Sequence, residues 1–428
     1  MSSSPSIAIV GAGLSGLLLA RYLQCNSISC TIYEREASRS SRAQGGSLDL
    51  HSDSGLIAMK GAGLLEEFRK LSRPEDDQMR ILDKDGKVWF DDRDGAMRRM
   101  VGSLLKFVGG DRPEIDRTDL RNILIDSLQL GTIRWDHHFQ FAEPLPSGSY
   151  KLHFANASPA ETDILIGADG TWSRVRPLLT TVLPVYTGVS FFEVVITDID
   201  TNHPALAELA GKGSAMIMGD GKGIMPQRNS RGITRVYVTV GRTAEDWLEE
   251  NPLPDDPTEA RKLLKSFFQP SFDPSVLELI DVCDDAPMRS WKIYAMPPGG
   301  LDWSTTKHKG ITLIGDAAHV MSPFAGEGAN LALIDAYDLG KALVATIKGK
   351  EPATMDKVDA GLRSFEKRML KRAEASAQES QYNMELLYAP EAPKEFIDLF
   401  LVYFPTPMNL LRLGLQYTKE SLDGWYGY

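Results

Sequence analysis

Three short apolar runs, each ending at a glycine, stand out in the pattern of hydrophobic and polar positions. Residues 7–10, 164–166 and 311–314 are apolar except for one threonine, and a glycine follows each run. Short apolar runs bounded by turn residues are typical of strands buried in a parallel sheet. Helical spacing follows the first run at Leu17–Leu23, and a further strand is expected at Cys30–Tyr33. The pattern predicts one α/β domain assembled from three separated stretches of chain.

A second pattern, with a period of two residues, fills much of the chain between these stretches. It is clearest at Val185–Ile196 and at Gly232–Val240. Met216–Met225 and Arg80–Phe90 each contain an Asp-Gly pair, which is a strong hairpin signal. The alternation therefore predicts an antiparallel sheet inserted into the first domain.

The first apolar run leads into the sequence G-x-G-x-x-G, formed by Gly11, Gly13 and Gly16. In dinucleotide-binding folds, the first glycine allows a tight turn, the second lets the backbone approach a pyrophosphate, and the third allows close helix packing. The following helix would point its free N–H groups and positive dipole end at the phosphates. Glu34 ends the second strand, where an acid typically binds the ribose diol. The predicted contacts are Gly11, Gly13, Leu14, Ser15, Gly16, Glu34 and Arg35.

These elements predict an α/β chain (α+β overall) with more than one domain. Apolar residues are spaced for a helix at Leu331–Ala345, and a long charged helix is expected from Met355 to about Leu387. A Rossmann-like domain would carry the inserted antiparallel sheet, and the long helix would bridge the two. The expected division is 1–72, 103–178 and 281–350 for the nucleotide domain, 73–102 and 179–280 for the substrate sheet, and 355–428 for the bridging helix and a cover segment.

Two further turns give the chain a family resemblance. Asp169-Gly170 follows the second apolar run, and Gly315-Asp316 follows the third. Together with the glycine motif, and in this order, they resemble the FAD-dependent aromatic hydroxylases, the class A flavoprotein monooxygenases similar to para-hydroxybenzoate hydroxylase. Residues 45–51, 114–121 and 321–328 look like the tetracycline-inactivating branch of that family.

The resemblance implies a flavin site and its chemistry. FAD would be reduced by transiently bound NADPH and would react with dioxygen to a flavin hydroperoxide that hydroxylates the substrate. Residues 326–328 would bring a helix N-terminus to the flavin ring, with Glu327 pointing to solvent or capping the helix. No catalytic base is assigned, and the histidines are interpreted as structural. The implied FAD contacts are Asp49, Arg117, Asp169, Gly315, Asp316, Gly328, Ala329 and Asn330; Arg42 would receive NADPH, and Pro323, Phe324 and Gly326 would wall the reactive face.

The substrate end resembles the tetracycline-inactivating branch less closely. Where that branch carries a glutamine, an arginine and a histidine, this chain has Glu193, either Ala215 or Met216, and Tyr237. The substrate is therefore expected to be an aromatic, phenolic or polyketide-like molecule, with tetracycline incidental. The strand alternation leaves open whether Phe191 and Glu193, or Phe192 and Val194, face the flavin. The predicted substrate residues are Phe192, Glu193, Ala215, Met225, Tyr237 and Phe324.

Composition limits the classes of binding partner and the cellular compartments that are expected. The net charge of −11 argues against nucleic acid as a partner. Three cysteines without metal-ligand spacing fit a reducing compartment and no metal site. No signal peptide or membrane span is recognised, so a cytoplasmic monomer is expected. Two rival functions stay open: an FAD oxidoreductase without oxygen insertion, and a non-catalytic flavin-binding redox sensor.

Overall fold

The protein is described by a computed structural model that covers most of the 428 residues. The described residues are 4–41, 45–74, 78–91, 112–299, 301, 303, 307–349 and 353–397. The predicted NADPH residue Arg42 and most of the predicted cover segment, residues 398–428, lie outside them. In this part of the chain, no helix is long and apolar enough to cross a membrane.

The chain divides into two compact units. Unit 1 comprises Met1–Arg73, Glu114–Thr187 and Ile293–Tyr382, and unit 2 comprises Pro74–Pro113, Gly188–Lys292 and Asn383–Tyr428. The predicted mixed helix and sheet fold, with a nucleotide-binding layer and an inserted sheet, is confirmed. The predicted domain boundaries, with a separate C-terminal part, stay a prediction.

Unit 1 is built on a parallel sheet that brings the three apolar runs together. Within the described chain this sheet has five strands, in the order β17-β11-β1-β2-β7, and each pairing between neighbours is parallel. Strands β1 and β11 are buried at every position, as expected for strands covered on both faces. The strands are β1 (Ile7–Val10), β2 (Thr31–Tyr33), β7 (Ile133–Arg134), β11 (Ile164–Gly167) and β17 (Ile311–Leu313).

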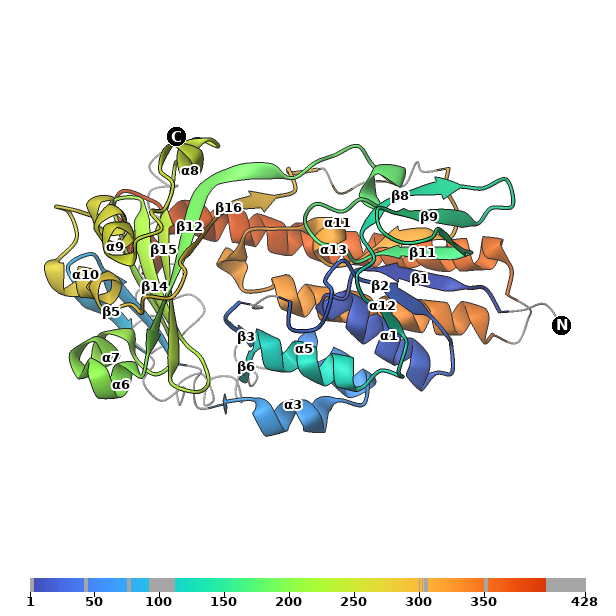
Figure 1. Ribbon diagram of the computed structural model, residues 1–428, viewed down its shortest axis with the longest axis horizontal. Helices are drawn as coiled ribbons and strands as arrows, with labels where there is room; N and C mark the ends of the chain where they lie inside the picture. The colour runs from blue at the N-terminus through green and yellow to red at the C-terminus, as the bar shows by residue number, and fades with distance from the viewer. Residues whose placement is uncertain are drawn as a thin grey trace, which may run out of the picture. The chain divides into compact units, whose positions relative to one another are not determined.

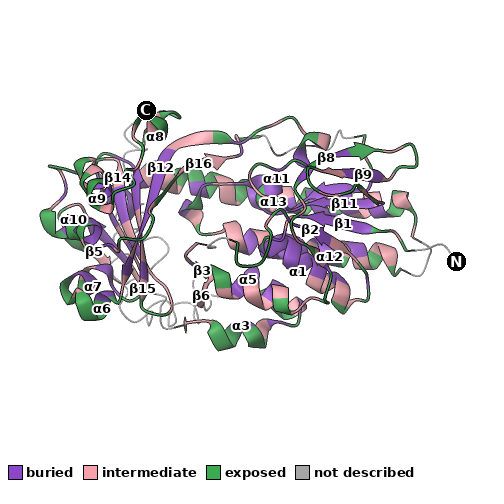
Figure 2. Cartoon of the chain, in the orientation of Figure 1, coloured by how far each residue is buried: buried purple, intermediate pink, exposed green. Residues whose placement is uncertain are grey.

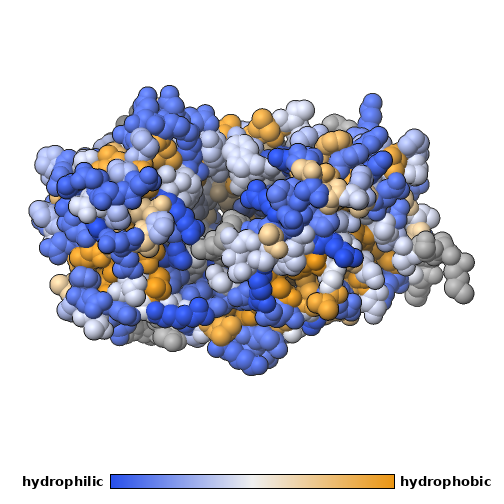
Figure 3. Space-filling model, viewed as in Figure 1, coloured by the Kyte–Doolittle hydropathy of each residue, from blue (hydrophilic) through white to orange (hydrophobic). Residues whose placement is uncertain are grey.

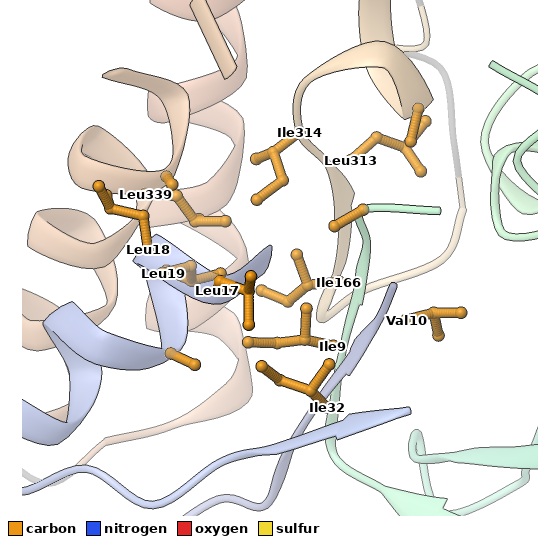
Figure 4. Close-up of a cluster of buried hydrophobic side chains, with 14 of the residues drawn as sticks. Ile9, Val10, Leu17, Leu18, Leu19, Ile32, Ile166, Leu313, Ile314 and Leu339 are labelled. Carbon is orange, nitrogen blue, oxygen red and sulfur yellow. The ribbon is translucent and has the colours of Figure 1, made fainter. Parts of the chain in front are cut away.

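Apolar side chains join this sheet to its helices. Figure 4 shows Leu17 and Leu19 of helix α1 (Leu14–Cys25) close to Ile9 and Ile32 of the sheet. Helix α12 (Gly328–Ile347) adds Leu339 to the same cluster. These side chains are fully buried, so each stabilises unit 1 by about 1.5–3 kcal/mol relative to an exposed position.

Further elements of unit 1 surround this core (Figure 1). Strand β3 (Ser47–Asp49) pairs antiparallel with β6 (Glu114–Asp116), which leads directly into helix α5 (Arg117–Asp126). The predicted long helix is confirmed as α13 (Met355–Leu387). The others are β8 (Phe139–Pro144), β9 (Tyr150–Phe154), β10 (Ala160–Thr162), α2 (Gly55–Gly61), α3 (Leu65–Leu71), α11 (Asp316–His319) and the 3₁₀ turns Arg176–Leu178 and Pro323–Ala325.

Unit 2 is built on the predicted inserted sheet. Its described strands are ordered β16-β12-β15-β14-β13-β4-β5, and both predicted hairpins are present. One pair, β4 with β13, is parallel rather than antiparallel, which is possible because no hairpin joins these two strands. The strands are β4 (Met79–Asp83), β5 (Val88–Asp91), β12 (Val185–Thr197), β13 (Ser214–Gly219), β14 (Lys222–Arg228), β15 (Ile233–Val240) and β16 (Arg289–Ala295).

One face of this sheet packs against helices. Phe192, Val238 and Ile224 lie in register across three strands and share an apolar cluster with side chains of helices α9 and α10. Figure 2 shows that these strands are largely buried, whereas green, exposed positions lie on the helices. The helices of unit 2 are α6 (Ile199–Asn202), α7 (Pro204–Ala210), α8 (Trp247–Glu250), α9 (Pro257–Ser266) and α10 (Pro274–Asp281).

The face of the protein seen in Figure 3 is mainly polar, with small scattered apolar groups. Such scattering is ordinary for a folded chain, because polar surface alone cannot cover it.

Candidate functional site

The glycine loop of unit 1 has the backbone geometry that the motif requires. Gly11 has φ +105°, and an added Cβ there would lie 2.3 Å from the Ala168 carbonyl oxygen. At Gly16 an added Cβ would lie 2.2 Å from the Gly11 oxygen. Gly13 differs, because the nearest atom to a Cβ added there is the Ala168 oxygen at 4.0 Å. The first and third glycines are thus required by the fold itself, and the space at Gly13 is open.

Glu34 and a buried arginine hold this loop in place. A Glu34 carboxylate oxygen accepts the Ala12 N–H at 2.6 Å, and the other accepts the Glu36 N–H at 2.9 Å. Arg121 donates to the Ala12 carbonyl oxygen at 3.2 Å and pairs with Glu36 at 2.8 Å. From the sequence, Arg121 was expected to share a helix face with Arg117, one turn before it, but no role was predicted for it.

The Asp169-Gly170 turn is held by its own carboxylate. Asp169 accepts the backbone N–H of Arg174 at 2.7 Å, while its other carboxylate oxygen is buried and has no hydrogen-bond partner among the described residues. Burial raises the pKa of Asp169, and hydrogen bonds from Ser173 and the Arg174 backbone partly offset this. Buried Arg176, which the sequence analysis did not assign, donates to the carbonyl oxygens of Ala317 and Asp316 and so ties the two turns together.

A buried charge network supports the Gly315-Asp316 turn. Asp335 accepts the Gly315 N–H at 3.1 Å, lies 2.5 Å from His319 Nε2 and accepts a hydrogen bond from Arg372 at 2.8 Å. Burial would lower the pKa of His319, but the Asp335 carboxylate outweighs it and holds that pKa above its ordinary value. This network leaves the Asp316 side chain exposed at the start of α11.

Another cluster joins β3 to the start of α12. His51 lies between two carboxylates, with Nε2 2.9 Å from Asp49 and Nδ1 3.1 Å from Glu327. The expectation that Glu327 points to solvent or caps the helix is wrong: its carboxylate is drawn to His51, and it makes no side-chain cap. Asn330 is fully buried and bonds the Asp49 oxygen and the His51 N–H. Its amide is thereby bonded inside the protein, and the predicted cofactor contact at Asn330 stays a prediction.

The remaining predicted flavin residues lie around these turns. Arg117 is exposed at the first position of α5, and Arg35 is exposed just after Glu34. Phe324 is 9% exposed, whereas its neighbours Pro323 and Gly326 are exposed. Leu14 and Ser15 begin α1, and Gly328 and Ala329 begin α12.

These residues fit an FAD molecule. The first N–H groups of a helix have no partner within that helix, which suits the start of α1 for a pyrophosphate. Added Cβ atoms at Gly326 and Gly328 would meet no heavy atom of the described chain within 4 Å, so a flat ring system can approach that backbone. The groups that would hold FAD are therefore the Gly13 backbone, the Glu34 carboxylate, Asp316 and the start of α12.

The face of the unit 2 sheet opposite the helices carries part of the predicted substrate set. Glu193, Tyr237 and Met225 lie in register across β12, β15 and β14. Phe192 and Ala215 do not join them. Both are buried in the cluster that packs against the helices, so a substrate contact at these two residues stays a prediction that the packing does not favour. The alternation had separated the two faces, but only the packing shows which one the helices cover.

The same face also holds Phe191, and it holds Trp291 and Arg235, which were not predicted from the sequence. Phe191, Tyr237 and Trp291 form an aromatic trio, with ring centroids 5.6–6.3 Å apart. Arg235 donates to the Glu193 carboxylate at 2.8 Å, and Glu193 is 6% exposed. Arg235 could have been placed on this face from the sequence, because it lies two residues before Tyr237 on the same strand.

A comparison with models of known protein families establishes the family of the chain. The model of the FAD binding domain family matches residues 5–380. The chain belongs to this family. The predicted family is confirmed, and the protein is an FAD-dependent monooxygenase of the class A aromatic hydroxylase type.

Its relatives span most of its length. It is 28% identical to the monooxygenase penA of Penicillium thymicola, over 92% of this chain and 98% of that protein. It is also 28% identical to the 6-methylsalicylate 1-monooxygenase atA of Aspergillus terreus, over 79% of this chain and 74% of that protein. The solved tetracycline destructase Tet(55) shares the fold, with a TM-score of 0.68 at 19% identity, over 94% of this chain and 97% of that one.

Proposed function

We propose that this family member uses NAD(P)H and dioxygen to hydroxylate a planar aromatic, phenolic or polyketide-like compound. The observation that carries the proposal is the unit 2 sheet face on which an aromatic trio and a buried ion pair occur together. Clusters of apolar side chains with a few placed polar groups are typical of small-molecule sites.

The aromatic trio would supply the apolar surface for a flat substrate. Aromatic rings favour tilted or edge-to-face contacts at centroid distances of about 4.5–7 Å. The contact between Phe191 and Trp291 is tilted by 50° at 5.6 Å, and that between Tyr237 and Trp291 is edge-to-face at 6.3 Å. A substrate ring would extend this arrangement.

The Glu193–Arg235 pair would orient the substrate. Its carboxylate retains acceptor capacity beyond the Arg235 bond, because an ionised carboxylate has about four lone-pair sites. A phenolic or enolic hydroxyl can donate to it. The residues Glu193, Tyr237 and Met225 are therefore the proposed substrate contacts of unit 2.

The bound cofactor would supply the oxygen chemistry, and the chain would supply position and charge. The glycine loop would hold the pyrophosphate, and Glu34 the ribose diol. Asp316 would accept hydrogen bonds from the ribityl chain. The start of α12 would present N–H donors and the positive end of a 20-residue helix to the ring. NADPH would bind only transiently, with Arg42 as its proposed receiving group.

The proposal is tested with a panel of phenolic, enolic and non-aromatic compounds scored by NADPH oxidation. We expect phenolic or enolic members alone to accelerate it. The Glu193→Gln variant should raise the KM of an accepted phenol roughly ten- to a hundredfold, as for a weakened bond to a charged group. Glu143→Gln, a surface partner of His153, is the matched control. Equal oxidation with every compound would contradict the proposal and favour an oxidoreductase without oxygen insertion.

A further inference from the structure

The environment of His51 differs from that of a histidine that merely packs. Its ring is 5% exposed, and each of its nitrogens faces a carboxylate oxygen, at 2.9 Å for Asp49 and 3.1 Å for Glu327. A neutral imidazole has one N–H and can donate to only one of them. The doubly protonated ring donates to both, so the geometry is that of an imidazolium held between two anions.

The cluster lies at the N-terminus of α12, the helix end that would face the flavin ring. Glu327 immediately precedes Gly328, the first residue of α12, and Asn330 in the first turn bonds the backbone on either side of this cluster, at Asp49 and His51. The N-terminus of a helix carries roughly half a positive charge. Two carboxylates beside it would cancel that charge, and a positive His51 leaves the trio with a net charge of −1 instead of −2.

We propose that His51 is a positioning residue of the flavin site: as a cation it fixes the Glu327 side chain and offsets the charges of Glu327 and Asp49. The surroundings of the α12 N-terminus are then less negative toward a reduced, anionic flavin ring than they would be with a neutral His51. This inference rests on the proposed function only in placing that ring at α12. It assigns a role to a histidine outside the glycine, Asp-Gly and Gly-Asp motifs.

The reduction potential of bound FAD measures this effect directly, because the potential reports how much more tightly the reduced form binds than the oxidised form. His51→Gln should weaken the reduced form about tenfold relative to the oxidised form, which lowers a two-electron potential by about 30 mV. Glu327→Gln should shift the potential upward, since it removes a negative charge. The double variant should return to within about 10 mV of the wild type, a roughly twofold change in relative affinity.

A control and a second readout separate this role from a structural one. His153→Gln removes a similar histidine–glutamate contact, at 3.1 Å, from the β8–β9 hairpin and should leave the potential unchanged. Titration of the apoprotein with FAD gives the affinity of the oxidised form. A fall in that affinity with no shift in potential would overturn the proposal, as would a His51→Gln shift that Glu327→Gln does not reverse.

Two further outcomes are also decisive. If His51→Gln does not fold, Glu327→Gln alone decides: an upward shift supports the proposal and an unchanged or lower potential overturns it. These potentials are measured without substrate. A protein that never inserts oxygen would refute the proposed function while leaving the His51 result standing.

Discussion

At the scale of single residues, the flavin site depends on charged groups that are buried in pairs. His319, Asp335 and Arg372 form one such network beneath the Gly315-Asp316 turn. Breaking a buried pair typically costs about 3–5 kcal/mol, because it leaves an uncompensated charge. The network therefore couples the stability of unit 1 to the geometry of the turn.

The network predicts a pH dependence. The pKa of His319 is raised above 6.5 in the folded protein, so its contribution is complete below that pH and is lost as the pH rises through the folded value. The pKa of Asp335 is lowered from 3.8, so its contribution is lost only as the pH falls through its folded value. His319→Gln should therefore cost most near pH 6 and progressively less at higher pH, as measured by denaturant unfolding. A cost that is constant from about pH 6 to pH 10 would contradict the assignment.

The glycine loop gives a second residue-scale prediction. Gly13→Val should fold but lose most of its FAD, because the added side chain fills the space open at Gly13. Gly16→Val should instead destabilise the protein, since its Cβ would clash with the Gly11 oxygen at 2.2 Å. Flavin absorbance and thermal unfolding of both variants distinguish the two effects. Full FAD occupancy in Gly13→Val would show that the pyrophosphate lies elsewhere.

At the scale of elements, the two faces of strand β12 have different roles. One face packs against helices and stabilises unit 2, and the other carries the proposed substrate contacts. Phe192 packs against Phe267 of the helical layer, and Phe191 and Glu193 lie on the opposite face. Adjacent residues of one strand therefore have different consequences when they are changed.

A matched pair of aromatic truncations tests this separation. Phe192→Ala should lower the free energy of unfolding by about 3–5 kcal/mol, as for a fully buried aromatic. Tyr237→Ala, on the partly exposed face, should cost less stability and mainly raise the KM for substrate. Chemical denaturation and steady-state kinetics on both variants are the measurements. The reverse pattern would assign substrate to the helical face.

The residues on these strands also lead to a prediction about the turnover of tetracycline. By the resemblance, Glu193 and Tyr237 would replace polar contacts of the tetracycline-inactivating branch, and each missing hydrogen-bond partner would cost about 1–3 kcal/mol. Tetracycline should therefore be turned over poorly. Oxygen-dependent loss of its absorbance, with the product mass, measures this. Efficient conversion to a singly oxygenated product would contradict the substrate assignment.

At the scale of the whole molecule, the sequence predicted the elements better than the contacts between them. The strands and turns around Gly11, Asp169 and Gly315 follow from local patterns, because apolar runs and glycines act within a few residues. The cluster of His51 with Asn330 joins positions 279 residues apart, so no local pattern marks it. The parallel pairing of β4 with β13 and the side of β12 covered by helices likewise depend on long-range packing.

The proposed function also predicts gating of the whole enzyme by its substrate. The chain has no second dinucleotide motif, so the nicotinamide would reach the flavin only in a transient arrangement that bound substrate favours. NADPH oxidation should be slow alone and several-fold faster with an accepted phenol, as measured by stopped-flow absorbance of the flavin. Fast reduction that ignores every aromatic ligand would contradict this gating.

The central claim is that oxygen enters an aromatic product, and isotopically labelled dioxygen tests it most directly. The enzyme, NADPH and an accepted phenolic or enolic compound are mixed under labelled dioxygen, and the product is weighed by mass spectrometry. Our account predicts a product that gains one labelled oxygen atom for each NADPH consumed. NADPH oxidation that leaves the label only in peroxide or water, with every compound that stimulates it, would contradict the account.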